Sequence, residues 1–348
     1  SLCYKKLSMS KKNSNVILRN GFKESEDLSK LYFSFKQKLK NFKKKSLVVA
    51  ISGGPDSLAL AALSKAYSYE NQVKFHYVLV DHNIRKNSKK EAIAVKKLLL
   101  KHKIHLNILM NKSKINKNIQ SQARKIRYDL LVKFCKKKKI KIILTAHNLE
   151  DQVETFFIRL SRGSGLTGLA AMKSSNKLSN NIILSRPLLD TKKRILIKIS
   201  KNVFGKYFKD PSNNNKKYLR TKIRNLKRPL LKSGISYDQI IKSINNLASS
   251  KETLDDYYNK IFNKIVKRTK KLILIDFIKF NNLNIDIKVK ILNDSIKSLK
   301  NNYYFVRSKK VINLIKNIES HGFKKGTLGG CLFFIKKDKL CLKIEQSD

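Results

Sequence analysis

The sequence has few acidic residues and no long apolar run. Its 348 residues include 24 Asp and Glu against 78 Lys and Arg, which leaves a formal net charge of +54. No apolar run reaches the length of a membrane span, and the first residues lack the hydrophobic core of a secretion signal. We therefore expect a cytoplasmic protein without a membrane span, although the basic start of the chain is also compatible with organelle targeting.

Cysteine is also scarce. Cys3, Cys135, Cys331 and Cys341 lie far apart and form no C-x-x-C pair. This spacing argues against a structural zinc site, a cluster-binding motif and a disulfide framework. It favours a protein of a reducing compartment.

The charge balance favours a polyanionic partner. Nucleic acid is the commonest partner of a chain with a pI near 10.2. However, most of the excess is lysine alongside abundant Asn and Ile, which an AT-rich genome would produce without selection for binding. Charge is therefore a reason to expect RNA or DNA binding, but only the sequence motifs can indicate a specific function.

Strand-like and helical patterns alternate through the first half of the chain. The strand-like segments are SLVVAIS, KFHYVLV, HLNILM and KIILTAH, with helical patterns between them such as 91–101 and 122–136. This alternation predicts an α/β fold in which helices wrap a parallel sheet. Ligands of such folds bind at the carboxyl ends of the strands.

We expect three parts along the chain. Residues 1–27 form an N-terminal extension, residues 28–231 a catalytic domain, and residues 232–348 a smaller α+β domain. Within the catalytic domain, 191–231 reads as helical and very basic, interrupted by the turn sequence DPSNNN. The smaller domain should contain a long helix over 237–267 and a hairpin in TLGGCLFFIKKDKLCLKIE.

The most informative stretch is VVAISGGPDSLALAALS, where a strand pattern breaks into SGGPDS and resumes as a helix. The glycines allow tight turning, Pro suits a first helical turn, and a helix N-terminus attracts phosphate. SGGPDS matches S-G-G-x-D-S, the pyrophosphate-binding loop of enzymes that cleave ATP between its α and β phosphates. It is not a Walker A loop. The residues predicted to bind ATP at this turn are Ser52, Gly53, Gly54, Pro55, Asp56 and Ser57.

A second constellation lies in TAHNLEDQVETFFIRLSRG. On a helix from 148, Asp151 and Glu154 are three residues apart, and His147 stands at the entry. A stripe of His, Asp and Glu at a sheet edge can orient a base, bind a metal or activate an amine. Acids also favour first helical turns for purely structural reasons, and that alternative stays open.

Two basic groups are weaker signals. Arg124 and Arg127 are three residues apart on one helical face, a spacing suited to a phosphate or carboxylate. Asp210, Arg220 and Arg224 fall in the basic segment DPSNNNKKYLRTKIRNLKRP, which we expect to contact RNA. Solvated surface helices of the same composition are common.

Taken together, these residues resemble the tRNA(Ile)-lysidine synthetases of bacteria and plastids. The resemblance runs in order through VVAISGGPDSLAL, VLVDHNIR, NIQSQARKIRYDLL, TAHNLEDQVETFFIRLSRGSGLTGLAAM, RPLL and KDPSNNNKKYLRTKIRN, and KKGTLGGC is similar to part of the family's C-terminal domain. It implies a PP-loop ATP pyrophosphatase fold. It places the protein in a bacterial cytosol or a plastid stroma.

The resemblance also implies a two-step reaction with ATP and Mg²⁺. The C2 oxygen of the wobble cytidine in the CAU anticodon of tRNA(Ile) is adenylated, and the ε-amine of free lysine then displaces AMP. The product, lysidine, pairs with A rather than G. Asp81 and His82 join the ATP site and Asp56 binds the metal. The residues expected to act in catalysis are Asp56, His147, Asp151 and Glu154.

The remaining roles implied by the resemblance concern binding. Arg124 and Arg127 are candidates for phosphate or lysine-carboxylate contacts, and the basic segment and the smaller domain would bind the tRNA. Whether the protein is a monomer or a homodimer is left open.

Two rival interpretations remain. A tRNA thiolase or an amidotransferase-type synthetase could share the loop, but thiolation would normally need paired cysteines, and none are paired here. A catalytically inactive RNA-binding protein could keep the fold. Acidic side chains beside a polyanion give a pure binder no advantage, which counts against that interpretation.

Overall fold

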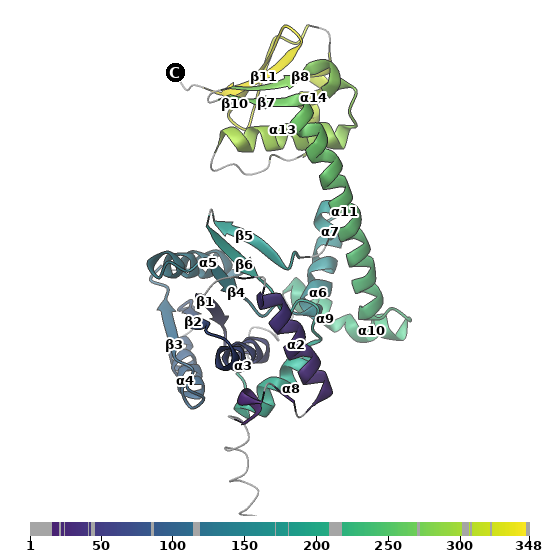
Figure 1. Cartoon of the computed structure of the whole chain (residues 1–348). Coiled ribbons are helices and arrows are strands. Elements are labelled where there is room, and N and C mark those ends of the chain that lie inside the picture. The colour runs from purple at the N-terminus through teal and green to yellow at the C-terminus, as the bar shows by residue number, and fades with distance from the viewer. Residues whose placement is uncertain are drawn as a thin grey trace, which may run out of the picture. The chain divides into compact units, whose positions relative to one another are not determined.

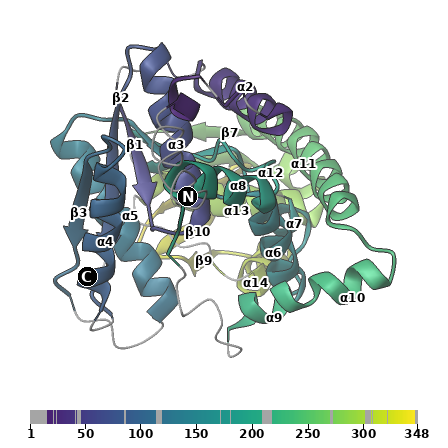
Figure 2. The same ribbon diagram turned by 90° about the horizontal axis from the view of Figure 1, so that it is seen from below.

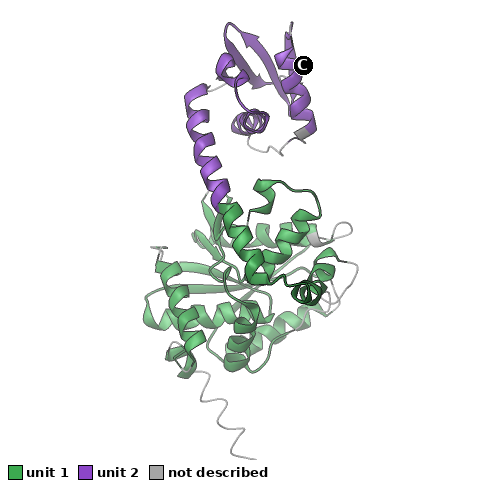
Figure 3. Ribbon diagram, turned by 90° about the vertical axis from the view of Figure 1, so that its right-hand side faces the viewer, with its two compact units in different colours: residues 1–248 green, residues 249–348 purple. Residues whose placement is uncertain are grey.

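The chain folds into two compact units. The computed structural model places Ser1–Ala248 in unit 1 and Ser249–Asp348 in unit 2 (Figure 3). It describes residues 16–20, 22–23, 25–40, 42, 46–84, 87–113, 119–170, 172–179, 181–208, 218–269, 272–300, 306, 308–320 and 322–345. Within these ranges, no helix combines the length and the apolar character that a membrane crossing needs.

Unit 1 alternates strands and helices. Its strands are β1 (Ser46–Ile51), β2 (Lys74–Asp81), β3 (Leu106–Met110), β4 (Ile142–Leu144), β5 (Ser175–Ser179) and β6 (Ile182–Ser185). Its helices are α2 (Glu26–Lys40), α3 (Pro55–Glu70), α4 (Ser88–Leu100), α5 (Ile119–Lys137), α6 (Leu149–Leu160), α7 (Leu166–Leu169), α8 (Lys193–Phe204), α9 (Leu219–Asn225) and α10 (Lys227–Lys232). The long helix α11 (Tyr237–Ile265) begins in this unit.

A six-stranded sheet forms the centre of unit 1 (Figures 1 and 2). The strand order is β3-β2-β1-β4-β6-β5, with parallel pairing throughout except for β5, which is antiparallel to β6. Side chains of α2, α3, α4 and α8 pack on one face of the sheet, and side chains of α5 pack on the other. The predicted fold class, a parallel sheet wrapped by helices, is confirmed.

Helix α3 is buried on nearly all sides. Its alanines, such as Ala59, Ala61 and Ala62, are fully buried. Small side chains let the sheet and α8 approach closely, and a helix without a polar face belongs to a core. This packing fixes the N-terminus of α3, at Pro55, where β1 ends.

The chain reverses its direction across the sheet between β1 and β4. From β1 it proceeds to β2 and β3 on one side, whereas β4 pairs with β1 on the other side and leads on to β6. Val48 lies opposite Ile143, and Val49 lies opposite Leu144. The residues that follow β1 and β4 therefore emerge side by side at a topological switch point, where α/β sheets bind ligands.

Unit 2 is a small α+β domain, as predicted. Its antiparallel sheet has the order β7-β8-β11-β10-β9, and Phe280, Ile291, Ile315 and Phe333 are fully buried in its core. The strands are β7 (Val266–Arg268), β8 (Leu272–Asp276), β9 (Lys325–Leu328), β10 (Cys331–Lys336) and β11 (Lys339–Ile344). The helices are α12 (Phe277–Asn281), α13 (Ile285–Leu299) and α14 (Ser308–Glu319).

Sequence and structure differ in detail at a few places. The hydrophobic pattern predicts neither β5 nor the four-residue α7. The sequence of β5, SNKLS, is mostly polar because β5 is a short strand at the edge of the sheet. The predicted domain division at 231–232 precedes α11, whereas the compact units separate at Ala248 and Ser249, inside that helix. The turn DPSNNN lies outside the described residues.

Phe333→Ala should destabilise unit 2 by about 3–5 kcal/mol, because the ring is fully buried and its removal leaves a cavity. Phe33→Ala is the matched control, since Phe33 is 60% exposed, and it should change the free energy of unfolding by no more than about 0.5 kcal/mol. Denaturant unfolding of the full chain measures both. Equal losses of unfolding free energy in the two variants would contradict the assignment of Phe333 to the core.

Candidate active site

The turn after β1 is closed by the hydroxyl group of Ser57. That hydroxyl donates to the Gly54 carbonyl at 3.0 Å and accepts from the backbone N–H and the hydroxyl of Ser52, both at 3.1 Å. Pro55 begins α3, and no described side chain caps this helix end at Gly54. The N-terminus of α3 thus keeps its positive end open to an anion.

Gly53 cannot be replaced without a change of the loop. Its φ is +84°, in the left-handed region, and a Cβ there would lie 2.7 Å from Cγ2 of Val95. The Gly53 carbonyl accepts a hydrogen bond from the backbone N–H of Phe208 at 3.0 Å. The segment after α8 is thereby tied to the loop.

The side chain of Asp56 turns from the loop toward α8 and α6. Burial raises the pKa of Asp56 to about 6, an effect that the nearby Lys193 opposes and Asp151 reinforces. Lys193 Nζ lies 3.6 Å from Asp56 Oδ2. The other oxygen, Oδ1, is buried and has no described partner within hydrogen-bond distance, although the nearby Asn148 side chain lowers the pKa of the carboxyl.

The acid stripe on α6 is held in place by a capping box. The Asn148 side chain accepts from the backbone N–H of Asp151 at 3.0 Å, and the Asp151 carboxylate accepts from the backbone N–H of Asn148 at 3.1 Å. Glu154, one turn on, is only 4% exposed. The core side of α6 is carried by Leu149 and Val153, which pack against the beginning of α11.

Arg220 and Arg224 from α9 meet these acids directly. Arg220 Nε donates to Glu154 Oε2 at 2.6 Å, and its Nη2 lies 3.2 Å from Asp151 Oδ1. Arg224 Nε donates to Glu154 Oε1 at 2.5 Å. Both residues were expected to contact tRNA, but the structure engages them with carboxylates, so that role stays a prediction.

His147 lies among arginines at the end of β4. Burial, together with Arg186, Arg124, Arg220 and Arg127, lowers the pKa of His147 to about 3. The imidazole is therefore neutral at physiological pH. Its Nδ1 lies 3.0 Å from the hydroxyl of Thr145, which orients the ring.

Asp81 and His82 lie at the carboxyl end of β2, which pairs with β1, the strand that precedes the Ser52–Ser57 loop. Asp81 is 4% exposed, and one of its carboxylate oxygens accepts from the backbone N–H of Asn83 at 2.9 Å. Burial and Arg127 lower the pKa of His82. Since Arg127 also lowers the pKa of His147, α5 presents this arginine toward both strand ends.

The structure thus gathers most of the predicted site residues around the switch point between β1 and β4. It adds others that the sequence reasoning did not single out, namely Thr145, Asn148, Glu150, Arg186 and Lys193. Lys193 stands in the unremarkable run TKKRIL, where no motif distinguishes it from neighbouring lysines. Asp210 lies outside the described residues.

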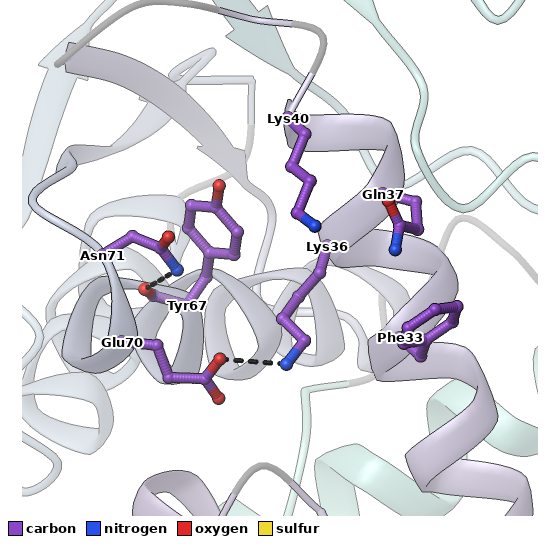
Figure 4. Close-up of a pocket in the computed structure, with 7 residues that line it drawn as sticks. All are labelled: Phe33, Lys36, Gln37, Lys40, Tyr67, Glu70 and Asn71. Atoms are coloured by element: carbon purple, nitrogen blue, oxygen red, sulfur yellow. Dashed lines mark hydrogen bonds and ion pairs between the residues drawn. The ribbon is translucent and has the colours of Figure 1, made fainter.

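Unit 1 also contains a hollow that lies away from this site. It has a volume of ≈ 180 Å³, and Figure 4 shows Lys36 reaching across to Glu70, which it contacts at 3.0 Å. The lining residues are Phe33, Lys36, Gln37, Lys40, Tyr67, Glu70 and Asn71. Glu70 ends α3, so the hollow is about 20 Å along that helix from the loop at Pro55.

Comparison with known proteins identifies the family. A family model described as the PP-loop domain matches residues 28–231. The tRNA(Ile)-lysidine synthase of Wolbachia pipientis wMel is 34% identical over 297 residues, which cover 83% of this chain and 68% of that protein. The tRNA(Ile)-lysidine synthase of Rickettsia akari (strain Hartford) is 30% identical over 311 residues, covering 87% of this chain and 70% of that protein.

A solved structure supports the fold alone. The U34-tRNA thiolase NcsA from Methanococcus maripaludis with its [4Fe-4S] cluster aligns with a TM-score of 0.55 at 19% identity, covering 64% of this chain and 79% of that one. Fold, loop geometry and sequence relatives lead to the same result. The chain is a PP-loop protein and belongs to the tRNA(Ile)-lysidine synthase family.

Proposed function

We propose that this protein is an ATP-using ligase that converts the wobble cytidine of tRNA(Ile) with a CAU anticodon into lysidine, changing codon reading from AUG to AUA. One observation carries the proposal beyond the family name. The acids of α6 and the turn before α3 lie together, because Lys193 contacts both: its Nζ lies 3.6 Å from Asp56 Oδ2, and its backbone N–H donates to Glu150 Oε2 at 2.9 Å. The proposed sites for phosphate and for the amine are thereby adjacent.

In the first step, the C2 oxygen of the cytidine attacks the α-phosphorus of ATP. The new O–P bond forms as the bond to the bridging oxygen of the β-phosphate breaks, and pyrophosphate leaves with the electron pair. The open N-terminus of α3 and the loop from Ser52 to Ser57 would bind the pyrophosphate. An amide-like oxygen is a poor leaving group, and adenylation makes it a good one.

Asp56 fits the requirements of a Mg²⁺ ligand. Its Oδ1 is buried without a described hydrogen-bond partner, and hard cations prefer carboxylate oxygens. Among the described residues, no three His, Cys, Asp or Glu side chains gather as a metal site. The ion would therefore take further ligands from the phosphates and water, and when bound it would neutralise charge on the triphosphate.

In the second step, the lysine ε-amine attacks C2 and AMP leaves. The ammonium of free lysine must first lose a proton, and we assign that proton to Asp151, the more exposed of the two acids. Glu154 would hold the amine. Since Arg220 and Arg224 pair with these carboxylates, at least one guanidinium has to withdraw before the lysine can bind.

His147 and the arginines of α5 would position the substrates. A neutral imidazole can hydrogen-bond a cytosine edge without repelling the cationic amine that follows. Arg124 and Arg127 remain candidates for a phosphate or for the lysine carboxylate.

The tRNA would extend over the basic segment 191–231 and the domain at 232–348, as the sequence predicts. The excess of positive charge, +54 overall, supports backbone contacts. We place the protein in a compartment that contains tRNA and ATP, the bacterial cytoplasm or the plastid stroma.

The decisive experiment mixes the full chain with labelled lysine, ATP, Mg²⁺ and transcripts of the isoleucine and methionine tRNAs that share the CAU anticodon. Lysine should enter the isoleucine transcript alone, with AMP and pyrophosphate released. If ATP is cleaved without lysine transfer, the nucleophile is a different one. If tRNA binds and ATP stays intact, the protein is a binding module and the proposal fails.

Asp151→Asn should lower lysine transfer by about 10²-fold or more, because the isosteric amide keeps the cap but cannot accept a proton. Pyrophosphate release in a single turnover should continue, since the acid acts in the second step. Asp190→Asn is the matched control: Asp190 is 67% exposed and pairs with Lys38. Loss of both steps to the same extent would contradict this division of roles.

The ring of His147 should stay neutral from pH 8 down to about pH 5, because burial and the surrounding arginines lower its pKa to about 3. Histidine-selective NMR of the full chain measures this, with His147→Asn identifying the resonance. A ring that protonates near pH 6.5, the ordinary histidine value, would show that the arginines do not surround it in solution.

A further inference from the structure

The phosphate-binding turn has no cation of its own. Residues Ser52–Ser57 include no Lys or Arg. A Walker A loop, by contrast, carries within its motif the lysine that reaches the outer phosphates. When the bond between the α and β phosphates breaks, negative charge develops on the departing pyrophosphate, and any cationic side chain that joins the Mg²⁺ ion in stabilising it has to come from another segment of the chain.

Helix α8 delivers a lysine to this place. Lys193, its first residue, places Nζ 3.6 Å from Asp56 Oδ2 on the loop. The backbone N–H of Lys193 donates to Glu150 Oε2 at 2.9 Å, which ties α8 to α6. Buried Leu196 and Ile199 fix the helix against α3 and the sheet. The backbone of Lys193 is therefore fixed, and only its side chain can move.

The ammonium of Lys193 forms only a long ion pair with Asp56. Two lysines near this edge make short ion pairs, Lys38 with Asp190 at 2.7 Å and Lys192 with Asp238 at 2.8 Å, whereas Lys227 lies 3.6 Å from Glu150. The 3.6 Å separation at Lys193 exceeds the length of a hydrogen bond. With a side chain that is 36% exposed, Lys193 has room to turn toward a ligand on the loop.

The N-terminal ends of α3, α6 and α8 converge, because Lys193 contacts both other helices and the backbone N–H of Leu149 donates to the carbonyl of Thr191 at 3.0 Å. Helix N-termini carry partial positive charge. Carboxylates already occupy two of these ends, Asp151 in the capping box of α6 and Glu150 on the backbone N–H of Lys193, so the open end is that of α3, and Lys193 adds a full positive charge beside it.

We infer that Lys193 contacts the β and γ phosphates of ATP and stabilises the leaving pyrophosphate in the adenylation step. The inference rests on the proposed function and adds a residue to it. The ammonium donates hydrogen bonds to the phosphate oxygens and transfers no proton. The electron pair of the broken P–O bond stays on pyrophosphate, and AMP stays on the cytidine.

The test compares Lys193→Met with Lys193→Arg and with the neighbouring control Lys192→Met. Equilibrium binding of Mg²⁺-ATP to the full chain without tRNA gives a readout that does not require turnover. Lys193→Met should raise the dissociation constant by about 10-fold to 100-fold, the range expected for a charge-assisted hydrogen bond. Lys193→Arg should recover most of the affinity, and Lys192→Met should match the wild type.

Kinetics provide the second readout. In Lys193→Met, the KM for ATP should rise and kcat should fall, whereas the KM for lysine should not change. Lys193→Gln serves in its place if the Met variant does not fold, as judged by circular dichroism. Wild-type ATP affinity in these variants, or an Arg variant as weak as the Met variant, would overturn the inference. If the wild type binds ATP but makes no lysidine, the proposed function fails while the binding comparison still decides the role of Lys193.

Discussion

The site depends on the parallel pairing of β1 with β4. Because Val48 lies opposite Ile143 and both strands end at the same edge, the loop after β1 and the histidine after β4 are forced together. The helices that follow, α3 and α6, then begin side by side. The proposed phosphate site and the proposed amine site are neighbours because of this arrangement. A shift of register between β1 and β4 would move the two sites apart.

Electrostatics at this edge follow from the same packing. Glu154 is buried and needs a partner, because an isolated carboxylate is expensive to remove from water. Arg220 and Arg224 provide it from a segment 66 and 70 residues further along the chain. Burial of Glu154 thus also holds α9, part of the basic segment, at the sheet edge.

Much of this could be predicted from the sequence. Alternating periodicity predicts the sheet, and the motif between Ser52 and Ser57 predicts the turn from β1 into α3, because turn chemistry is local; the anion site at this turn stays a prediction. Lys193 and the pairing of Arg220 with Glu154 could not be predicted. In a chain with 78 Lys and Arg, spacing alone does not distinguish a lysine that faces a loop from one in solvent. Only the packing of α8 and α9 against α6 makes that distinction.

The hydroxyl of Ser57 has a consequence for the energetics of nucleotide binding. Its single proton is used on Gly54, and its oxygen accepts twice from Ser52, so its hydrogen-bonding capacity is fully used within the turn. The backbone conformation is therefore set before any nucleotide arrives. For the proposed phosphate site this means that little conformational entropy is lost on binding and that more of the interaction energy appears as affinity.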